Sequence, residues 1–547
     1  MSERMRELVE MLQRADAELT APGAPFEVRD EVVLGERMQA FRIRQRSLGQ
    51  VVLESASFGD RPGIVMDDGR TLTFGEVPDA VARCAARLRD VHGIGPGDRV
   101  AIWGANSLGW LLAFWATTSI GGVVVAMNGW WTPVEAQNAL ELSSPSLLLV
   151  DAKRRERMPD GVDMPVYEMD EEAAASDAHR PADGRPADIA EDDPAMLIFT
   201  SGTTGRPKAA QLSHRTIIGY CQLQMFIAAR GMHMAGRAAD GPPMTRLGVF
   251  PLFHVSGLGS TVSSLMSGTP TVWMTGRFDA GKIIRLTKEH GISQWGGTTT
   301  HVMRLLEHPD VETVDPTTIR SVGVGGSAST PEIIRRTEAR FPHLKGTFSS
   351  GYGSTESGGL ISYAPNALLS EAVDCVGPPL PTVEVKIVDG EICARSPIVM
   401  LGYYNNEKAN ADVFYPGRWV RTGDFGRVED GALFLAARLR DMIIRGGENI
   451  YPFEIENRLD EHPDVLETAV IGVDDVVLGQ EVKAIVVARQ GSELTGDALR
   501  EWCAETLASY KIPAHVEIRT EALPRNASGK ILKHVLAGHS ENTFVED

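Results

Sequence analysis

The chain has 547 residues, more than one hydrophobic core normally holds, so we expect at least two domains. Apolar residues make up 43% and charged residues 23%, which is the balance of a globular protein. The net charge of −19 and the lack of a long basic run argue against a nucleic-acid partner, because phosphate backbones are bound by basic surfaces.

The N-terminus and the cysteines bear on where the protein resides. Residues 1–19 are charged throughout and lack the apolar segment of a signal peptide, so we expect a polar amphipathic helix there. The five cysteines are scattered and form no CxxC pair, which argues against a disulfide framework and a structural zinc site. A reducing, cytoplasmic location is therefore predicted.

One stretch, residues 108–127, carries no charge and is long enough to be weighed as a membrane span. Gly121 and Gly122 interrupt it before the β-branched run Val123–Val125. These residues favour a buried helix followed by a buried strand over one membrane-spanning helix. We therefore predict no transmembrane segment.

Strand-like apolar runs alternate with helical patterns over most of the chain. Strands are predicted at residues 99–103, 123–127, 246–250, 269–274, 292–295 and 321–324, with a helix at 108–118. A further helix should begin after Asp279 and stop at Gly291. This alternation is typical of a layered α/β protein with parallel strands. Residues 151–194, with few apolar side chains, are interpreted as a partly disordered surface excursion of the same domain.

The chain after residue 441 indicates a separate small α+β unit. Strands are predicted at residues 467–473, 481–488 and 516–519, with a helix at 496–507 and a final loop and helix. We therefore predict an N-terminal domain over residues 1–440 and a C-terminal domain over residues 441–547.

The strongest local signal for chemistry is a segment rich in glycine and hydroxyl side chains that follows a short apolar strand. Its members are Thr200, Ser201, Gly202, Thr203, Thr204, Gly205, Arg206, Pro207 and Lys208. Glycines let backbone N–H groups converge on phosphate oxygens, hydroxyls add donors, and a lysine adds a point charge. Pro207 excludes a Walker P-loop. A flexible surface turn is the alternative, which Lys208 and the preceding strand disfavour.

A second cluster, Gly351–Glu356, follows the small residues Gly325, Gly326 and Ser327. Tyr352 lies between glycines, where an aromatic ring can lie flat against a purine, and Glu356 can bind Mg²⁺. A turn rich in glycine and serine would explain these residues equally well.

Two later motifs are also weak when taken singly. Arg421–Asp424 supplies a carboxylate that could accept hydrogen bonds from ribose hydroxyls, although turn chemistry alone would explain it. Pro524–Lys530 places a lysine after a glycine-bearing loop, where a solvated side chain is the plainer interpretation.

In order and spacing, the motifs resemble the adenylate-forming (AMP-binding) enzyme superfamily, in its acyl-CoA synthetase or fatty-acid–CoA ligase branch. The resemblance runs from about residue 50 to residue 536 and rests on residues 200–208, 351–356, 422–424, 438–456 and 524–530. It implies a large multi-layer α/β N-terminal domain and a small mobile α+β C-terminal domain that carries a catalytic lysine. It also implies ATP and CoA as co-substrates and Mg²⁺ as a cofactor.

The resemblance further assigns roles to matching residues. Residues 200–208 would hold the β- and γ-phosphates of ATP, and Thr355 would contact the α-phosphate. The adenine would be bordered by Gly325, Gly326, Ser327 and Tyr352, and the ribose would be held by Asp424 and Arg438. Glu356 would bind Mg²⁺, and Lys530 would bridge the substrate carboxylate and the α-phosphate. The implied chemistry is an in-line displacement at the α-phosphorus, which needs little proton transfer because the attacking carboxylate is already ionised.

The resemblance also implies a hinge at Asp441, about which the small domain rotates between the two half-reactions. Ala437 and Arg440 depart mildly from the glycine and lysine usual in this motif. Gly446 and Gly447 resemble the strand and turn that meet the pantetheine arm of CoA, where glycines permit a close approach.

The acid pocket should involve residues 253–257. Members that activate amino acids usually carry Asp where this chain has His254; because an unpaired buried ammonium is costly, an amino-acid substrate is disfavoured. We expect His254 to form a wall or gate of the pocket and not to act as a general base. The remaining predicted pocket residues are Val255, Trp295, Gly296, Gly297 and Thr300. The glycines should leave room for a chain or ring, so a phenylalanine at Gly297 should shorten the preferred acid.

The function that these motifs favour is ATP-dependent ligation of a carboxylic acid to CoA, with an acyl-adenylate intermediate. The acid is expected to be a medium- or long-chain fatty acid, with aryl or cyclic acids next. The rival within the superfamily is a ligase that loads a carrier protein, and the alternative of another class is a non-catalytic ATP-binding sensor. Mere binding would need neither Lys530 nor Glu356. A homodimer is compatible with the sequence.

Overall fold

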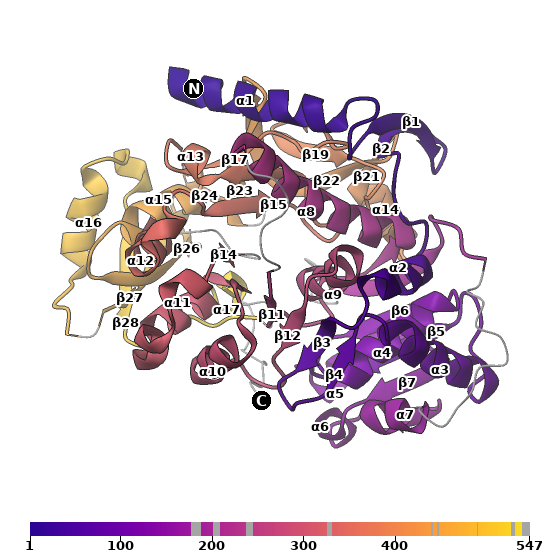
Figure 1. The fold of residues 1–547 in the computed structure, drawn as a ribbon. Coiled ribbons are helices and arrows are strands. Elements are labelled where there is room, and N and C mark those ends of the chain that lie inside the picture. Colours follow the sequence, from indigo (N-terminus) through magenta and orange to yellow (C-terminus); the bar gives the residue numbers. More distant parts are fainter. Residues whose placement is uncertain are drawn as a thin grey trace.

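The computed structural model describes residues 1–176, 188–200, 208–236, 244–324, 331–372, 374–438, 441–445, 448–489, 491–526 and 531–538. Most of them form a large body of stacked sheets and helices, and the C-terminal part of the chain, yellow in Figure 1, forms a smaller unit beside it. The predicted α/β class is confirmed. The domain boundary between residues 440 and 441 stays a prediction, since residues 439–440 lie outside the described ranges.

The helices of the large body are α1 (Glu3–Thr20), α2 (Leu48–Ser55), α3 (Val77–Asp90), α4 (Leu108–Ser119), α5 (Pro133–Ser143), α6 (Ala152–Arg155), α7 (Met169–Ser176), α8 (His214–Met234), α9 (Val255–Ser267), α10 (Ala280–His290), α11 (Thr299–Glu307), α12 (Pro331–Arg340), α13 (Asn366–Leu369) and α14 (Glu407–Val413). Helix α10 begins and ends as predicted. Asp279 accepts a hydrogen bond from the Lys282 amide at its start, and Gly291 takes a left-handed φ of 61° at its end.

The first sheet has seven strands in the order β20-β10-β9-β6-β5-β7-β8. Their bounds are β5 (Arg99–Trp103), β6 (Val123–Met127), β7 (Leu147–Val150), β8 (Val166–Glu168), β9 (Pro194–Thr200), β10 (Lys208–Ser213) and β20 (Gly402–Tyr403). Strands β5 to β9 run parallel, whereas β10 is antiparallel to both β9 and β20. Residues 108–127 form the buried helix α4 and strand β6, as predicted. Among the described helices, none is both long and apolar enough to cross a membrane.

The second sheet has the order β14-β13-β11-β12-β3-β4. Its strands are β3 (Pro62–Met66), β4 (Thr71–Thr73), β11 (Arg246–Gly248), β12 (Thr271–Trp273), β13 (Gln294–Gly297) and β14 (Ser321–Val324), all parallel except β4. One hydrophobic core joins residues of both sheets to helices α2, α3, α4, α8 and α9, and a second core lies under α10 and α11. Layers of this kind bury both faces of a parallel sheet.

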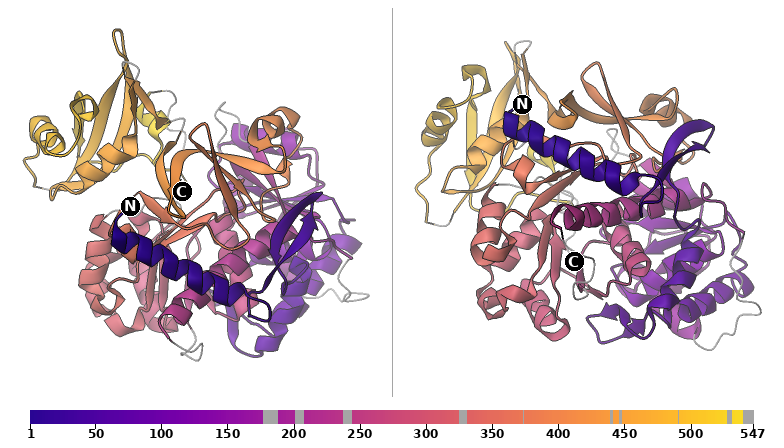
Figure 2. Two further views of the ribbon diagram at one scale, coloured as in Figure 1. Left: turned by 90° about the horizontal axis from the view of Figure 1, so that it is seen from above. Right: turned by 45° about the horizontal axis from the view of Figure 1, so that its top comes forward.

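A third sheet is antiparallel and has the order β17-β23-β22-β19-β18, with β21 beside β22. Its bounds are β17 (Cys375–Gly377), β18 (Glu384–Val388), β19 (Glu391–Arg395), β21 (Phe414–Tyr415), β22 (Trp419–Glu429) and β23 (Ala432–Arg438), and a hairpin of β15 (Ser349–Tyr352) and β16 (Ser362–Pro365) lies beside it. Helix α1 lies across this sheet (Figure 2), because its buried face of Met5, Val9 and Leu12 packs against Phe434 and its neighbours. The amphipathic helix predicted for residues 1–19 is confirmed.

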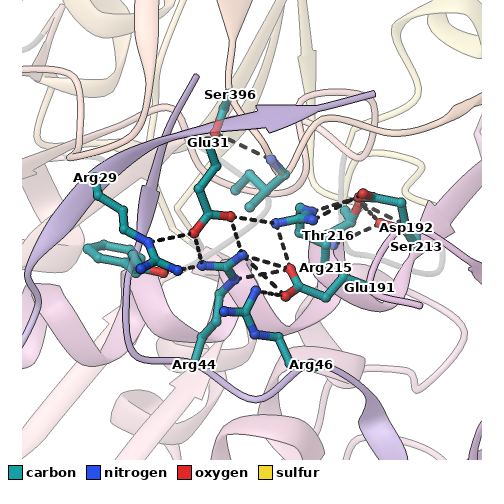
Figure 3. A network of polar contacts seen from close by, with 12 residues as sticks. Arg29, Glu31, Arg44, Arg46, Glu191, Asp192, Ser213, Arg215, Thr216 and Ser396 are labelled. Atoms are coloured by element: carbon teal, nitrogen blue, oxygen red, sulfur yellow. Dashed lines mark hydrogen bonds and ion pairs between the residues drawn. The ribbon is translucent and has the colours of Figure 1, made fainter. Parts of the chain in front are cut away.

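Strands β1 (Val28–Val33) and β2 (Glu36–Phe41) form a hairpin that an ionic network ties to the first sheet (Figure 3). Arg44 lies between Glu31 and Glu191, at 2.6 and 2.9 Å, and its hydrogen bonds lower the pKa of Glu31 to about 2. Arg215, at the start of α8, bridges Glu191 and Asp192. Because Asp192 lies just before β9, the network fixes the start of the strand that leads into the predicted ATP loop.

The segment 151–194 is more ordered than we expected. Strand β8 extends the first sheet, and Met169 at the start of α7 is buried in the main core. Glu172, on α7, pairs with Arg87 and His92, which offsets the cost of burying its carboxylate. Residues 152–176 therefore form an ordered edge of the first sheet that still lies largely at the surface, and residues 177–187 lie outside the described ranges.

The C-terminal unit has its own sheet, in the order β25-β24-β27-β26 with β28 beside β27. Its elements are β24 (Ile443–Arg445), β25 (Glu448–Ile450), α15 (Pro452–Asp460), β26 (Val465–Asp475), β27 (Gly479–Ala488), α16 (Gly496–Ala504), β28 (His515–Arg519) and α17 (Lys533–Leu536). Separate hydrophobic cores lie within this unit, one under α15 and α16 and one under α17. The predicted strands and helix of this α+β unit are confirmed.

Candidate active site

The predicted ATP loop begins and ends on two paired strands. Thr200 closes β9, Lys208 opens β10, and the two residues are direct partners in the antiparallel register. Phe199, the residue before Thr200, is covered by Trp131 at a ring distance of 5.0 Å, and Trp131 is 6% exposed. Trp131 therefore packs against the end of β9, the strand that leads into the loop. The predicted loop residues Ser201–Gly205 lie outside the described ranges.

Both ends of this loop meet the predicted Mg²⁺ ligand at Tyr403. The Tyr403 hydroxyl donates a hydrogen bond to Oε1 of Glu356 at 2.9 Å, and the Thr200 side chain lies beside the same phenol. The Lys208 ammonium lies over the Tyr403 ring, 5.0 Å from its centre. Tyr403 was not among the residues predicted from the sequence. The one signal in the sequence that could have indicated Tyr403 is its place directly after Gly402, in a short strand.

The residues predicted to hold the nucleoside also come together. The Tyr352 hydroxyl donates to Oδ2 of Asp424 at 2.9 Å, and Asp424 is 5% exposed. Asp424 on β22 is the direct cross-strand partner of Arg438 on β23. The predicted turn at residues 421–424 is instead part of the continuous strand β22, in which Gly423 takes a left-handed φ of 73°. Gly325, Gly326 and Ser327 lie outside the described residues.

The loop that carries Thr355 and Glu356 is held close to the body of the domain. A Cβ on Gly358 would lie 2.1 Å from the Ile398 carbonyl oxygen, and Gly358 has a φ of +83°. Only glycine fits this approach. The Met400 amide donates to the Glu356 carbonyl at 3.1 Å, so a hydrogen bond joins the segment before Tyr403 to this loop.

On the acid side, His254 precedes α9 and its ring contacts Phe253 at 4.9 Å. Burial lowers the pKa of His254 to about 4, so the imidazole is uncharged near neutral pH. Val255, the first residue of α9, is partly buried against the main core. A neutral wall here agrees with the expectation that the substrate carries no ammonium group. The side chain of Thr300 lies outside what the structure describes.

Strand β13 separates the predicted pocket residues into two sets. Trp295 is fully buried in the second core, and its indole donates to Thr287 at 3.0 Å. The expectation that Trp295 lines the pocket is therefore wrong, because neighbouring strand residues point to opposite faces. At Gly296, on the other face, an added Cβ would meet no atom within 4 Å, and the same holds for Gly323, its direct partner on β14. Gly323 was not among the predicted pocket residues.

Gly297 does not offer the room that we expected. A Cβ there would lie 2.7 Å from Cβ of His301 at the start of α11, so a larger side chain would push against that helix. We therefore expect a phenylalanine to shorten the preferred acid when it replaces Gly296, and not when it replaces Gly297.

We expect Gly296→Phe to reduce the catalytic efficiency for the longest acids about ten- to hundredfold and to leave short acids nearly unchanged. The ring would fill the open face of β13, and overpacking costs about 1–3 kcal/mol. The measurement is kcat/KM for a homologous series of acids. Gly297→Ala is the matched control, for which we expect an equal loss across the series. An unchanged length profile for Gly296→Phe would place the pocket elsewhere.

The C-terminal unit approaches this side of the large body. The pKa of His301 is lowered to about 4, chiefly by burial, and the positive charges of Arg304 and Arg525 add to this effect. Arg525 also pairs with Glu467 and forms a β-bridge with Ile531, so that the two ends of the predicted lysine loop meet. Lys530 itself, like Gly446 and Gly447, lies outside the described residues. Arg525 therefore brings one end of that loop toward the predicted acid pocket.

Buried histidines predict how stability depends on pH. Burial lowers the pKa of His214, His254 and His301 from 6.5 to about 4, so the unfolded chain binds more protons than the folded chain between these values. The stabilisation is complete above about pH 6.5 and is lost as the pH falls toward 4, by up to about 1.4 kcal/mol per pH unit for one such histidine. His214 accepts a hydrogen bond from the Leu48 amide at 3.1 Å.

We therefore expect the melting temperature to fall between about pH 6.5 and pH 4.5, and to fall less steeply in His214→Asn. His233→Gln, at an exposed position, is the control and should follow the wild type. A His214→Asn variant with an unchanged slope would contradict this account of His214.

The chain matches family models and relatives of known class. Residues 53–404 match the family model of the AMP-binding enzyme, and residues 454–530 match that of the AMP-binding enzyme C-terminal domain. A feruloyl-CoA synthase of Amycolatopsis sp is 32% identical over 510 residues, which cover 90% of this chain and 98% of that protein. A fatty acid–[acyl-carrier-protein] ligase of Streptomyces coeruleorubidus is 32% identical over 495 residues, covering 86% and 92%.

Solved structures agree with these relatives. A fatty acyl CoA synthetase of Mycobacterium tuberculosis has a TM-score of 0.68 and 28% identity, covering 91% of this chain and 99% of that one. The o-succinylbenzoate CoA synthetase of Bacillus subtilis, in complex with its acyl-adenylate intermediate, has a TM-score of 0.73 and 29% identity, covering 90% and 98%. The predicted family, fold and enzyme class are confirmed, whereas the roles of individual site residues stay predictions. The chain belongs to the AMP-binding enzyme family, as an AMP-forming acid–thiol ligase.

Proposed function

We propose that the chain converts a medium- or long-chain fatty acid into its CoA thioester, with Mg²⁺·ATP as the second substrate and AMP and pyrophosphate as products. The observation that carries the proposal is the convergence of Thr200, Lys208 and Glu356 on one point. It brings the ends of a phosphate-binding loop to a carboxylate that suits Mg²⁺. Asp424 and Tyr352 form a neighbouring polar pair that suits a nucleoside.

In the first step, a carboxylate oxygen of the acid attacks the α-phosphorus of ATP, a P–O bond forms, and pyrophosphate leaves. Lys208 and the loop amides would bind the β- and γ-phosphates, Asp424 would accept from the ribose hydroxyls, and Lys530 would face the attacking carboxylate. Bound Mg²⁺ would neutralise charge on the phosphates. Positioning and charge account for most of such catalysis, because the nucleophile needs no base.

In the second step, the CoA thiol loses its proton and its sulfur attacks the acyl carbon, and AMP leaves with the bonding electrons. Gly446 and Gly447 would admit the pantetheine arm after the small domain turns about Asp441. Glycines suit this place because a narrow ligand must pass close to the backbone.

The residues fit a magnesium ion. Mg²⁺ commonly uses one or two carboxylates together with substrate phosphates and water, so a dedicated protein cage is not required. Glu356 is the carboxylate that the motif predicts, and its Oε1 accepts a hydrogen bond from the Tyr403 hydroxyl at 2.9 Å.

Two features support a fatty acid, with aryl or cyclic acids next. The wall at His254 is uncharged near neutral pH, and Gly296 and Gly323 leave open space on the same face of their strands. The matched relatives act on feruloyl, fatty and o-succinylbenzoate groups by their names, and this range agrees with an apolar, adaptable pocket.

The test is a panel of acids of increasing length, assayed first for pyrophosphate release and then for CoA consumption. We expect both with fatty acids. Pyrophosphate release with transfer only to a carrier protein would favour the carrier-loading alternative, and absence of pyrophosphate exchange with every acid would favour an ATP sensor.

We also propose a cytoplasmic location. All five cysteines are buried and scattered along the chain, which suits a reducing compartment. Fractionation of the native cells tests this proposal.

We further propose that the chain forms a homodimer. Light scattering of the purified chain tests this oligomeric state.

A further inference from the structure

Tyr403 occupies a position where three parts of the predicted ATP site meet. Its side chain is largely buried, at 8% exposure. The phenol donates to Glu356 at 2.9 Å and lies beside the Thr200 side chain, while the ring faces Lys208 at 5.0 Å. One side chain thus contacts both ends of the loop and the predicted metal-binding carboxylate.

The backbone of Tyr403 is held as firmly as its side chain. Strand β20 pairs with β10, so that Tyr403 lies opposite Ala210. The Asn410 side chain accepts from the Tyr403 amide at 2.6 Å and donates to the Tyr403 carbonyl at 2.9 Å. On the next residue, the Tyr404 amide donates to the Ala209 carbonyl at 2.8 Å. These bonds fix where the phenol lies relative to β10 and hence to Lys208.

The protonation state of the phenol suits this arrangement. A tyrosine hydroxyl keeps its proton at neutral pH, so the Tyr403 phenol can donate to the Glu356 carboxylate, as it does at 2.9 Å. Hydrogen bonds to a charged group are stronger than those between neutral groups. Because one oxygen of Glu356 is held in this way, the direction of the whole carboxylate is fixed.

We propose that Tyr403 is a positioning residue that aligns Thr200 and Lys208 with the carboxylate of Glu356. This alignment would let the β- and γ-phosphates of ATP and the Mg²⁺ ion bind next to each other. The proposal rests on the proposed use of Mg²⁺·ATP. Tyr403 itself need not touch the nucleotide, since it acts through the residues that do.

The experiment compares two nucleotides on the full chain. In Tyr403→Phe we expect the affinity for Mg²⁺·ATP, measured by isothermal titration calorimetry, to fall about tenfold, the loss typical of one hydrogen bond to a charged group. The affinity for AMP should stay unchanged, because AMP lacks the β- and γ-phosphates. The Mg²⁺ concentration for half-maximal pyrophosphate exchange should rise. Tyr404→Phe, at the neighbouring position, is the matched control and should behave as the wild type.

A Tyr403→Phe variant that binds Mg²⁺·ATP as the wild type does, or that loses affinity for AMP and ATP equally, would overturn the proposal. Should this variant melt below the assay temperature, both titrations are made below its melting point, where the same selective loss is expected. A wild-type chain that fails to bind Mg²⁺·ATP would contradict the proposed function instead.

Discussion

Replacing Lys530 by alanine is expected to slow formation of the acyl-adenylate by about 10²–10³-fold and to leave transfer of the acyl group from supplied acyl-adenylate to CoA within a few-fold of the wild-type rate. Loss of one charged donor at the site of transition-state charge typically has an effect of this size on the step concerned. The lysine charge matters where the carboxylate attacks the α-phosphate, and thioester formation would use another orientation of the small domain. Pyrophosphate exchange measures the first step, and single-turnover CoA consumption measures the second.

The described residues on either side of Lys530 give this prediction a structural basis. Arg525 pairs with Glu467, whose carboxylate also accepts from the Leu523 amide, and Lys533 pairs with Glu456 at 2.6 Å. These pairs anchor both ends of the loop to β26 and α15. The anchored loop would therefore present the lysine at a defined place in one domain orientation.

Lys511→Ala is the matched control for Lys530→Ala. Lys511 belongs to the same unit and pairs with Glu454, so its removal also deletes a lysine charge from this unit. We expect wild-type rates for both steps. An equal fall of both half-reactions in Lys530→Ala would show that one orientation serves both.

The second large effect is expected for Asp424→Ala, which should weaken binding of ATP and AMP alike by about 10²-fold. The carboxylate is buried, and we expect it to accept both ribose hydroxyls, each through a charged hydrogen bond of about 1.5–3 kcal/mol. Its loss would also leave the buried Tyr352 hydroxyl without the acceptor that it has at 2.9 Å. Calorimetric titration with both nucleotides measures the effect.

Asp412→Ala, on the exposed side of α14, is the control and should bind both nucleotides normally. The comparison with Tyr403→Phe is informative, because that variant should discriminate between the nucleotides and Asp424→Ala should not. If Asp424→Ala lost ATP affinity and kept AMP affinity, Asp424 would act on the phosphates and not on the ribose.

Much of the architecture could be predicted because it depends on residues that are close in sequence. The Asp279 cap and the Gly291 stop define α10, and the charge-free run at 108–127 divides at Gly121 into α4 and β6. Caps, left-handed glycines and apolar periodicity act within a turn or a strand, so a local segment carries the information.

Other features could not be predicted because they depend on which residue lies opposite which. Trp295 and Gly296 are adjacent in sequence, and only the packing of β13 shows that one enters the core while the other faces open space. The apolar content of residues 151–176 is low, yet β8 joins the sheet and Glu172 is buried because Arg87 and His92 lie beside it.

The sequence by itself determined the family, the order of the motifs and the candidate groups for ATP, because the order of short motifs is a property of the chain alone. Only the tertiary structure decided which of these groups meet. Tyr352 reaches Asp424 across 72 positions, and Tyr403 reaches Glu356 across 47. Such contacts depend on strand register and on the path of the chain between distant segments, and neither is encoded in any local pattern.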